Sequence, residues 1–180
     1  MKKAISMTEG PLAKQILFVS LPLMLSNLLQ VLFNISDVAI VGRFAGSTAL
    51  GSVGSTSIFV TLFTGFLIGL GGGINVLVAR YYGAGRAKDV KKTVESSLII
   101  SLVAGVILLL VGLFGSPALL QTINTKPDLL PGAVMDLRVY FLGMPALALY
   151  NYGNAVFSAI GDTKKPLIYL AIAGVLNVIL

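Results

Sequence analysis

One apolar stretch of the sequence carries polar side chains at helical spacing. It runs from Ile16 to Gly42 and is long enough to cross a membrane. Gln30, Asn34 and Asp37 stand there at i, i+4 and i+7, which is one face of a helix. An isolated carboxylate in hydrocarbon is costly, so an acid inside a membrane span is by default a functional residue. We predict that this face lines a water-accessible cavity in which Asp37 is the functional acid.

The two amides on this face have a second interpretation. Gln30 and Asn34 can also hydrogen-bond to neighbouring helices, at about 1 kcal/mol each, without touching a substrate. Both interpretations of the amides stay open at this point.

The composition is that of a helical membrane protein. Hydrophobic residues make up 56% of the chain, charged residues 11%, and the mean hydropathy is +0.94. The charges cluster between long apolar runs, so we predict an all-α, polytopic transmembrane helix bundle. Cysteine and histidine are absent, which excludes disulfides, thiol chemistry, imidazole bases and the usual zinc and haem ligands. We expect no cofactor.

Apolar runs predict about five transmembrane helices, separated by short polar loops. The polar residues 1–15 precede these helices, and residues 16–180 form the bundle. The last run begins after Pro166, and its helix is only about 22 Å long against roughly 30 Å of hydrocarbon. We therefore expect the bundle to be truncated in its fifth helix. The predicted spans are 16–42, 56–79, 94–114, 136–160 and 167–180.

The fourth predicted span carries a polar face of its own. Asn151, Asn154 and Ser158 share one side of a helix there, and Tyr140 lies about three turns earlier. Pro145 stands mid-span and predicts a bend. We take Tyr140, Asn151 and Asn154 as further candidate cavity-lining residues.

Basic residues predict the orientation of the chain. With a cytoplasmic N-terminus, ten of the thirteen Lys and Arg residues fall in cytoplasmic segments. That excess satisfies the positive-inside rule and accounts for the pI near 9.7 without nucleic acid as a partner. The three on the other side are Arg43, Lys126 and Arg138.

Several of these features, in this order, resemble the N-terminal part of a multidrug and toxic compound extrusion (MATE) transporter. The likeness extends over nearly the whole chain from Gly10. The residues that carry it are Leu21-Pro22, Gln30, Phe33-Asn34-Ile35-Ser36-Asp37, Val41-Gly42-Arg43, Ala79, Tyr82-Gly83-Ala84-Gly85, Tyr140-Phe141, Pro145, Asn154, Gly161-Asp162-Thr163-Lys164-Lys165-Pro166 and Leu176-Asn177-Val178-Ile179-Leu180.

The resemblance implies two six-helix bundles, of which this chain supplies about five helices of the first, the N-terminal bundle. It implies a secondary active antiporter of the plasma membrane that expels organic cations in exchange for Na⁺ or H⁺. Asp37 matches the coupling residue, and Asn154 and Asn177 match polar positions in the same cavity. Asp37 and Asn177 are then the candidate ligands if the coupling ion is Na⁺. The partners implied are organic cations, the lipid bilayer and the missing C-terminal part of the transporter.

Three other functions compete with multidrug efflux. A lipid-linked oligosaccharide flippase of the same superfamily would need basic residues inside its cavity, and no Lys or Arg falls in the middle of a predicted span. An intramembrane aspartyl enzyme would need two carboxylates at one site, but Glu95 and Asp136 are predicted at helix ends, which leaves Asp37 alone. A non-transporting membrane fragment is the third.

Overall fold

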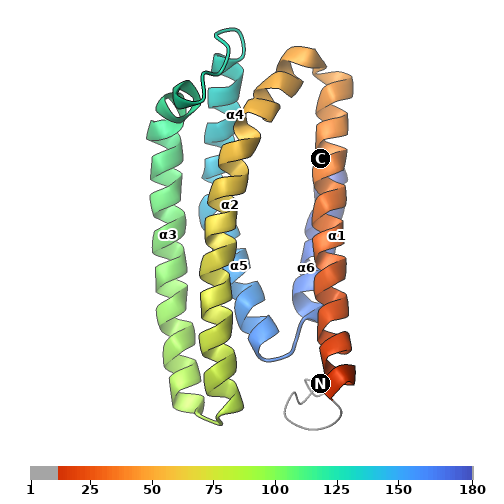
Figure 1. Cartoon of the computed structure of the whole chain (residues 1–180), viewed down its shortest axis with the longest axis vertical. Coiled ribbons are helices and arrows are strands. Elements are labelled where there is room, and N and C mark those ends of the chain that lie inside the picture. The colour runs from red at the N-terminus through yellow and green to blue at the C-terminus, as the bar shows by residue number, and fades with distance from the viewer. Residues whose placement is uncertain (1–11, 180) are drawn as a thin grey trace. The chain divides into compact units, whose positions relative to one another are not determined.

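A computed structural model describes the backbone of residues 12–179 and the side chains of residues 16–17 and 20–176. The described part is helical and contains no strand, which confirms the predicted all-α class (Figure 1). The helices are α1 (Leu12–Phe44), α2 (Gly46–Gly83), α3 (Ala87–Thr122), α4 (Leu130–Leu142), α5 (Met144–Ala159) and α6 (Lys164–Ile179).

Three of these helices are long and apolar enough to cross a membrane. They are α1 from Ser20 to Phe44, α2 and α3, and the bent pair of α4 and α5 makes a fourth if the pair counts as one span. The described part of α6 has 16 residues and falls short of that length. The described residues thus supply three to four of the roughly five predicted spans, with α6 at the position of the fifth.

The loop predicted at residues 43–55 is wrong, because α2 begins at Gly46 and only Ala45 separates it from α1. Small polar residues are typical of loops, but they are also tolerated in membrane helices. Here their hydroxyls bond back to the helix, Ser52 to the Thr48 carbonyl at 3.1 Å and Ser55 to the Gly51 carbonyl at 2.9 Å. The segment therefore keeps its backbone helical.

The predicted end of the third span at Phe114 is also wrong. Helix α3 continues through Pro117 to Thr122. The Ser116 hydroxyl donates a hydrogen bond to the Gly112 carbonyl, one turn back in the same helix. Proline removes one backbone donor, but membrane helices accommodate it when neighbouring polar groups satisfy the backbone.

The fourth predicted span is two helices rather than one bent helix. Helix α4 begins at Leu130, ends at Leu142, and meets α5 at an angle of 45° across Gly143. Pro145 lies in the first turn of α5, where a missing N–H costs nothing and the fixed φ suits a helix start. The proline therefore starts a new helix instead of bending an old one.

Two helix ends are closed by glycines in the left-handed conformation. Gly85 has φ +69° and follows α2, while Gly161 has φ +82° and follows α5. At the first, the Arg86 N–H bonds the Tyr81 carbonyl; at the second, the Asp162 N–H bonds the Phe157 carbonyl. These are the six-to-one bonds of a Schellman motif, which gives each helix a sharp end.

The chain divides into two compact units. Unit 1 holds the residues up to Ser36, Gly71–Ser97 and the residues from Tyr152 onward, and unit 2 holds Asp37–Leu70 and Leu98–Asn151. The main apolar core lies in unit 2, where side chains of α2, α3, α4 and α5 pack together. Its buried members are Phe59, Leu67, Leu108, Leu120, Ala133, Leu137, Phe141, Met144 and Ala148.

Glycines let the helices approach closely within each unit. In unit 2, a Cβ added at Gly112 would overlap the ring of Phe141, which is fully buried. In unit 1, a Cβ at Gly174 of α6 would overlap the ring of Phe33 of α1. Small residues at such contacts allow membrane helices to pack backbone against side chain.

Candidate ion and substrate site

The polar face of α1 is present as predicted. Gln30, Asn34 and Asp37 all lie within α1, and all three side chains are exposed. Apolar residues on the other faces of this helix, such as Leu28 and Val31, are exposed as well. The polar face of α1 therefore differs from the other faces of this helix in its polarity and not in its exposure. Gln30 and Asn34 belong to unit 1 and Asp37 to unit 2, so a shared cavity stays a prediction.

The serines beside this face are already satisfied by their own helix. Ser26 donates to the Pro22 carbonyl and Ser36 to the Leu32 carbonyl, each at 2.9 Å. Such back-bonding leaves the hydroxyls with little to offer a ligand. On this face, the side chains of Gln30, Asn34 and Asp37 make no such bond within the described residues.

Asn154 is held in unit 1 by a small polar network. The Ser158 hydroxyl donates to its amide oxygen at 3.4 Å, one turn further along α5. Asn75 of α2 donates to the carbonyl of the next residue, Ala155, at 2.9 Å. The Tyr152 hydroxyl donates to the Val94 carbonyl of α3 at 3.1 Å. Asn154 thus lies, half-buried, on a stretch of α5 that two neighbouring helices fix in place.

Asn75 is a residue that the sequence analysis missed. It lies in the glycine-rich part of α2, which the spacing of small residues marks as a packing surface. An amide inside an otherwise apolar helix is a usable signal, since such groups seek partners across helices. Its partner, 80 residues away, follows only from the structure.

Tyr140 and Asn151 have partners within unit 2. The Tyr140 hydroxyl lies 2.8 Å from the Thr64 hydroxyl of α2, and either oxygen can be the donor. Asn151 donates to the Leu147 carbonyl of its own helix at 2.9 Å. The first contact joins two helices and the second stays within α5, and the role of both residues in lining a cavity stays a prediction. Asn177 falls within α6, but its side chain is outside the described residues.

The structure corrects the position of Asp136. The sequence predicts Asp136 at a helix end, but it lies within α4, and its Oδ2 is 2.6 Å from the Thr56 hydroxyl of α2. The same hydroxyl is 2.9 Å from the Val53 carbonyl. The Thr56 hydroxyl has only one proton to donate to these two oxygens, and the carboxylate is the stronger acceptor. The hydroxyl therefore donates to Asp136. Asp136 is therefore a second acid inside the helix bundle, joined to a neighbouring helix.

Arg138 also lies within α4 rather than at its boundary. Its Nε donates to the Leu113 carbonyl of α3 at 3.1 Å. Residues two apart on a helix do not face each other, and the two charged side chains reach different helices. No ion pair joins Asp136 and Arg138, and within the described residues no three acidic side chains gather as a metal site.

We predict that Thr56→Val lowers stability measurably, because it leaves the half-buried Asp136 carboxylate without its hydroxyl donor. A hydrogen bond to a charged group is worth about 1.5–3 kcal/mol. Thr61→Val makes the same change at an exposed position of α2 and serves as the matched control. The midpoint of thermal unfolding, followed by circular dichroism, should fall for Thr56→Val alone. Equal midpoints for the two variants would contradict the assigned contact.

Comparison with known proteins decides the family. The model of the family described as MatE matches residues 22–180. The chain belongs to the MatE family. The probable multidrug resistance protein YpnP of Bacillus subtilis is 31% identical over 178 residues, which is 99% of this chain and 40% of that protein.

Solved structures agree with this MatE assignment. A MOP superfamily transporter from Pyrococcus furiosus matches with a TM-score of 0.92 at 26% identity, and reverse polarity of its binding pocket is described as suggesting a different function. An outward-facing multidrug resistance MATE family transporter matches with a TM-score of 0.88 at 27% identity. In both cases the alignment covers 100% of this MatE chain and 40% of the other protein.

The MatE assignment confirms the resemblance drawn from the sequence. The family consists of membrane transporters, which places the chain in transport rather than in catalysis. Like its relatives, it is a multi-pass membrane protein. This MatE chain spans about 40% of the length of the proteins it matches.

Proposed function

We propose that the complete protein expels organic cations from the cell in exchange for Na⁺ or H⁺, and that Asp37 is the residue at which the coupling ion binds. The observation that carries the proposal is a carboxylate on an exposed polar face of a membrane-spanning helix. Asp37 has no ion pair in the described part of the chain. Asp136, by contrast, has a hydroxyl donor from α2.

Neutralisation of the Asp37 carboxylate by the coupling ion explains how ion and substrate are exchanged. An ionised Asp37 attracts a cationic substrate, whereas a protonated or Na⁺-bound Asp37 carries no net charge and releases it. The coupling ion and the cationic substrate compete for the negative charge of one carboxylate, so binding of the ion favours release of the substrate. Alternating exposure of the site to the two sides of the membrane then makes the exchange vectorial. We propose Asn177 as a second oxygen ligand if the ion is Na⁺, and Gln30, Asn34, Tyr140, Asn151 and Asn154 as lining of the substrate path.

Substrate charge tests the proposal directly. Cells that express the complete protein should lose ethidium, a cation, faster than cells with an empty vector. An anionic dye such as calcein should leave both at the same rate. Export of the anion without the cation would overturn the substrate class.

We also propose a plasma-membrane location with a cytoplasmic N-terminus. Both basic connections of unit 1, between α2 and α3 and between α5 and α6, lie at the same end of that unit (Figure 1). The Asn75–Ala155 hydrogen bond supports this, because it pairs positions near the ends of α2 and α5. Basic residues at one end of the helices agree with the positive-inside rule.

Cysteine labelling tests this orientation, since the chain has no cysteine of its own. Lys88→Cys should be protected from a membrane-impermeant maleimide in whole cells and labelled in inverted vesicles. Lys126→Cys should behave in the opposite way. Both lysines are exposed, so folding should be retained in each variant. The reverse labelling pattern would contradict the proposed orientation.

A further inference from the structure

Asp136 is an acid inside the helix bundle that the proposed exchange at Asp37 does not use. It is half-buried in α4, one turn before Tyr140. The Thr56 hydroxyl of α2 lies 2.6 Å from its Oδ2, and Thr56 is only 1% exposed. The Tyr140 hydroxyl lies 2.8 Å from the Thr64 hydroxyl, which also belongs to α2. The contact between α2 and α4 is therefore polar at two positions, and one of them carries an acid.

The Thr56 hydroxyl can satisfy Asp136 in both of its protonation states. The hydroxyl oxygen has a second oxygen within reach, because the Val53 carbonyl is 2.9 Å away. When Asp136 is ionised, Thr56 donates to Oδ2. When a proton from water adds to Oδ2, the new acid O–H donates to the Thr56 oxygen, and the Thr56 O–H turns to the Val53 carbonyl. Neither state leaves the buried hydroxyl of Thr56 without an acceptor.

No positive charge holds Asp136 in its ionised form. An ion pair or several N–H donors would favour the carboxylate over the acid. Within the described residues, Asp136 has no ion pair, and Thr56 is its only hydrogen-bond donor. Arg138 follows two residues later, but its Nε donates to the Leu113 carbonyl of α3. The contact with α2 therefore tolerates loss of the negative charge.

Few ionisable groups surround Asp136 in unit 2. Residues 46–70 of α2 and 98–122 of α3 contribute to the same core as α4, and neither range contains an ionisable side chain. The other ionisable residues of unit 2 are Asp37, Arg43, Lys126, Asp128, Arg138, Tyr140 and Tyr150. In the part of the chain that the structure describes, none of them forms an ion pair. The protein thus supplies no counter-ion to Asp136.

The geometry fits a proton and not a metal ion. The oxygens of Thr56 and Asp136 are in direct hydrogen-bond contact, which leaves no space for a metal ion between them. Among the described residues, no three acidic side chains gather around a common point. The side chain of Asp136 is only half-buried, so a proton can reach it from water.

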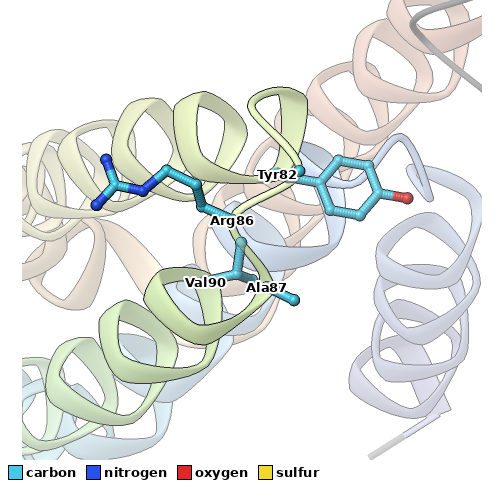
Figure 2. Close-up of a pocket in the computed structure, with 5 residues that line it drawn as sticks. Tyr82, Arg86, Ala87 and Val90 are labelled. Atoms are coloured by element: carbon cyan, nitrogen blue, oxygen red, sulfur yellow. The ribbon is translucent and has the colours of Figure 1, made fainter.

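The hollow between the ends of α2 and α3 offers no comparable group (Figure 2). It measures about 260 Å³ and is lined by Tyr82, Gly85, Arg86, Ala87 and Val90. Arg86 is the charged residue of this lining, and its Nε is 2.7 Å from the Asp89 carboxylate. An ionisable group without an ion pair partner therefore favours the α2–α4 contact over this hollow as a site for an ion.

We propose that Asp136 is a second proton-binding site, in addition to Asp37, and that it takes part in the exchange of substrate for H⁺. Uptake of one proton removes the negative charge from the α2–α4 contact, and release restores it. The inference rests on the proposed function and deepens it, because it names H⁺ as an ion that the complete protein takes up. The proton site itself follows from the contacts of Thr56 and does not depend on Asp37.

Titration of the Asp136 carboxyl group tests the proton site. In the complete protein with isotopically labelled aspartate, the carboxyl signal in the carbon NMR spectrum is identified by its loss in Asp136→Asn. The signal should shift with pH through one protonation step. Thr56→Val should raise the proton affinity about fivefold, because a hydrogen bond to the carboxylate is roughly twice as strong as one to the neutral acid. Thr56→Ser keeps the hydroxyl and should leave the proton affinity unchanged.

Ethidium transport in liposomes tests the use of this site. Asp136→Asn cannot exchange a proton and should lose uptake driven by a pH gradient, whereas Asp128→Asn, at an exposed position, should keep it. The pH of half-maximal uptake should move to a higher value in Thr56→Val, since Asp136 is then protonated more readily. It should stay unchanged in Thr56→Ser.

Three results would overturn the proposal. An Asp136 signal that stays constant over the whole pH range would show that the carboxyl group exchanges no proton. Equal proton affinities in Thr56→Val and Thr56→Ser would remove the hydroxyl from the site. Unchanged H⁺-driven uptake by Asp136→Asn would separate the site from transport. Failure of the proposed function differs from these, because the unchanged protein would then transport no ethidium while Asp136 still titrates.

Discussion

Asp37→Asn in the complete protein is expected to reduce ion-driven efflux of ethidium to the level of the empty vector. Asparagine has nearly the same size as aspartate and keeps an oxygen for hydrogen bonding. It cannot take up a proton at physiological pH, and it offers Na⁺ no negative charge. The coupling ion then has no site of exchange, so the rate should fall by at least about tenfold. Dye loss from energised cells, followed by fluorescence, measures the effect.

Asp128→Asn is the matched control for this experiment. It makes the same chemical change at an exposed position in the connection between α3 and α4, outside every helix. Its efflux should equal that of the unchanged protein at equal abundance in the membrane. Efflux by Asp37→Asn at the control rate would remove Asp37 from the coupling mechanism.

Gly112→Ala is expected to destabilise the chain strongly, by about 3 kcal/mol. The added methyl group would overlap the ring of Phe141, which belongs to the core of unit 2 and is fully buried. A buried ring cannot turn aside without displacing its neighbours, including Phe63, whose ring centre is 5.0 Å away. Circular dichroism is the suitable probe, because the chain contains no tryptophan.

Gly115→Ala provides the control for helix propensity. It lies on the same helix, and its new methyl group would meet only Val111 and Leu119, at 3.9 and 4.0 Å. Alanine favours a helix by up to about 1 kcal/mol over glycine, so this variant should be as stable as the parent or slightly more so. If Gly112→Ala is equally stable, the close contact between α3 and α4 is wrong.

The helical class, most of the helices and the polar face of α1 could be predicted from the sequence, because each depends on local composition or periodicity. The limits of α2 and α3 could not. Glycine, serine and proline are read as helix breakers, but Ser52, Ser55 and Ser116 satisfy the backbone within the helix. The start of α5 at Met144 depends on Pro145 in its first turn, where the sequence alone predicts a bend.

The hydrogen bond between Thr56 and Asp136 could not be predicted from the sequence, for a different reason. Thr56 and Asp136 are 80 residues apart, and only the packing of α2 against α4 brings them together. A faint signal is present, since Asp136 and Tyr140 stand at i and i+4 while their partners Thr56 and Thr64 share one face of α2. Such a pattern marks an interface between helices but does not reveal which pair of helices forms it.

Transport by the purified, complete protein in liposomes shows directly whether an organic cation is exchanged for Na⁺ or H⁺. A Na⁺ or H⁺ gradient is imposed across the liposome membrane, and movement of ethidium in the opposite direction is recorded. We expect uptake that stops when the gradient is collapsed and that is absent with Asp37→Asn. Equal ethidium movement with and without a gradient of either ion would contradict it.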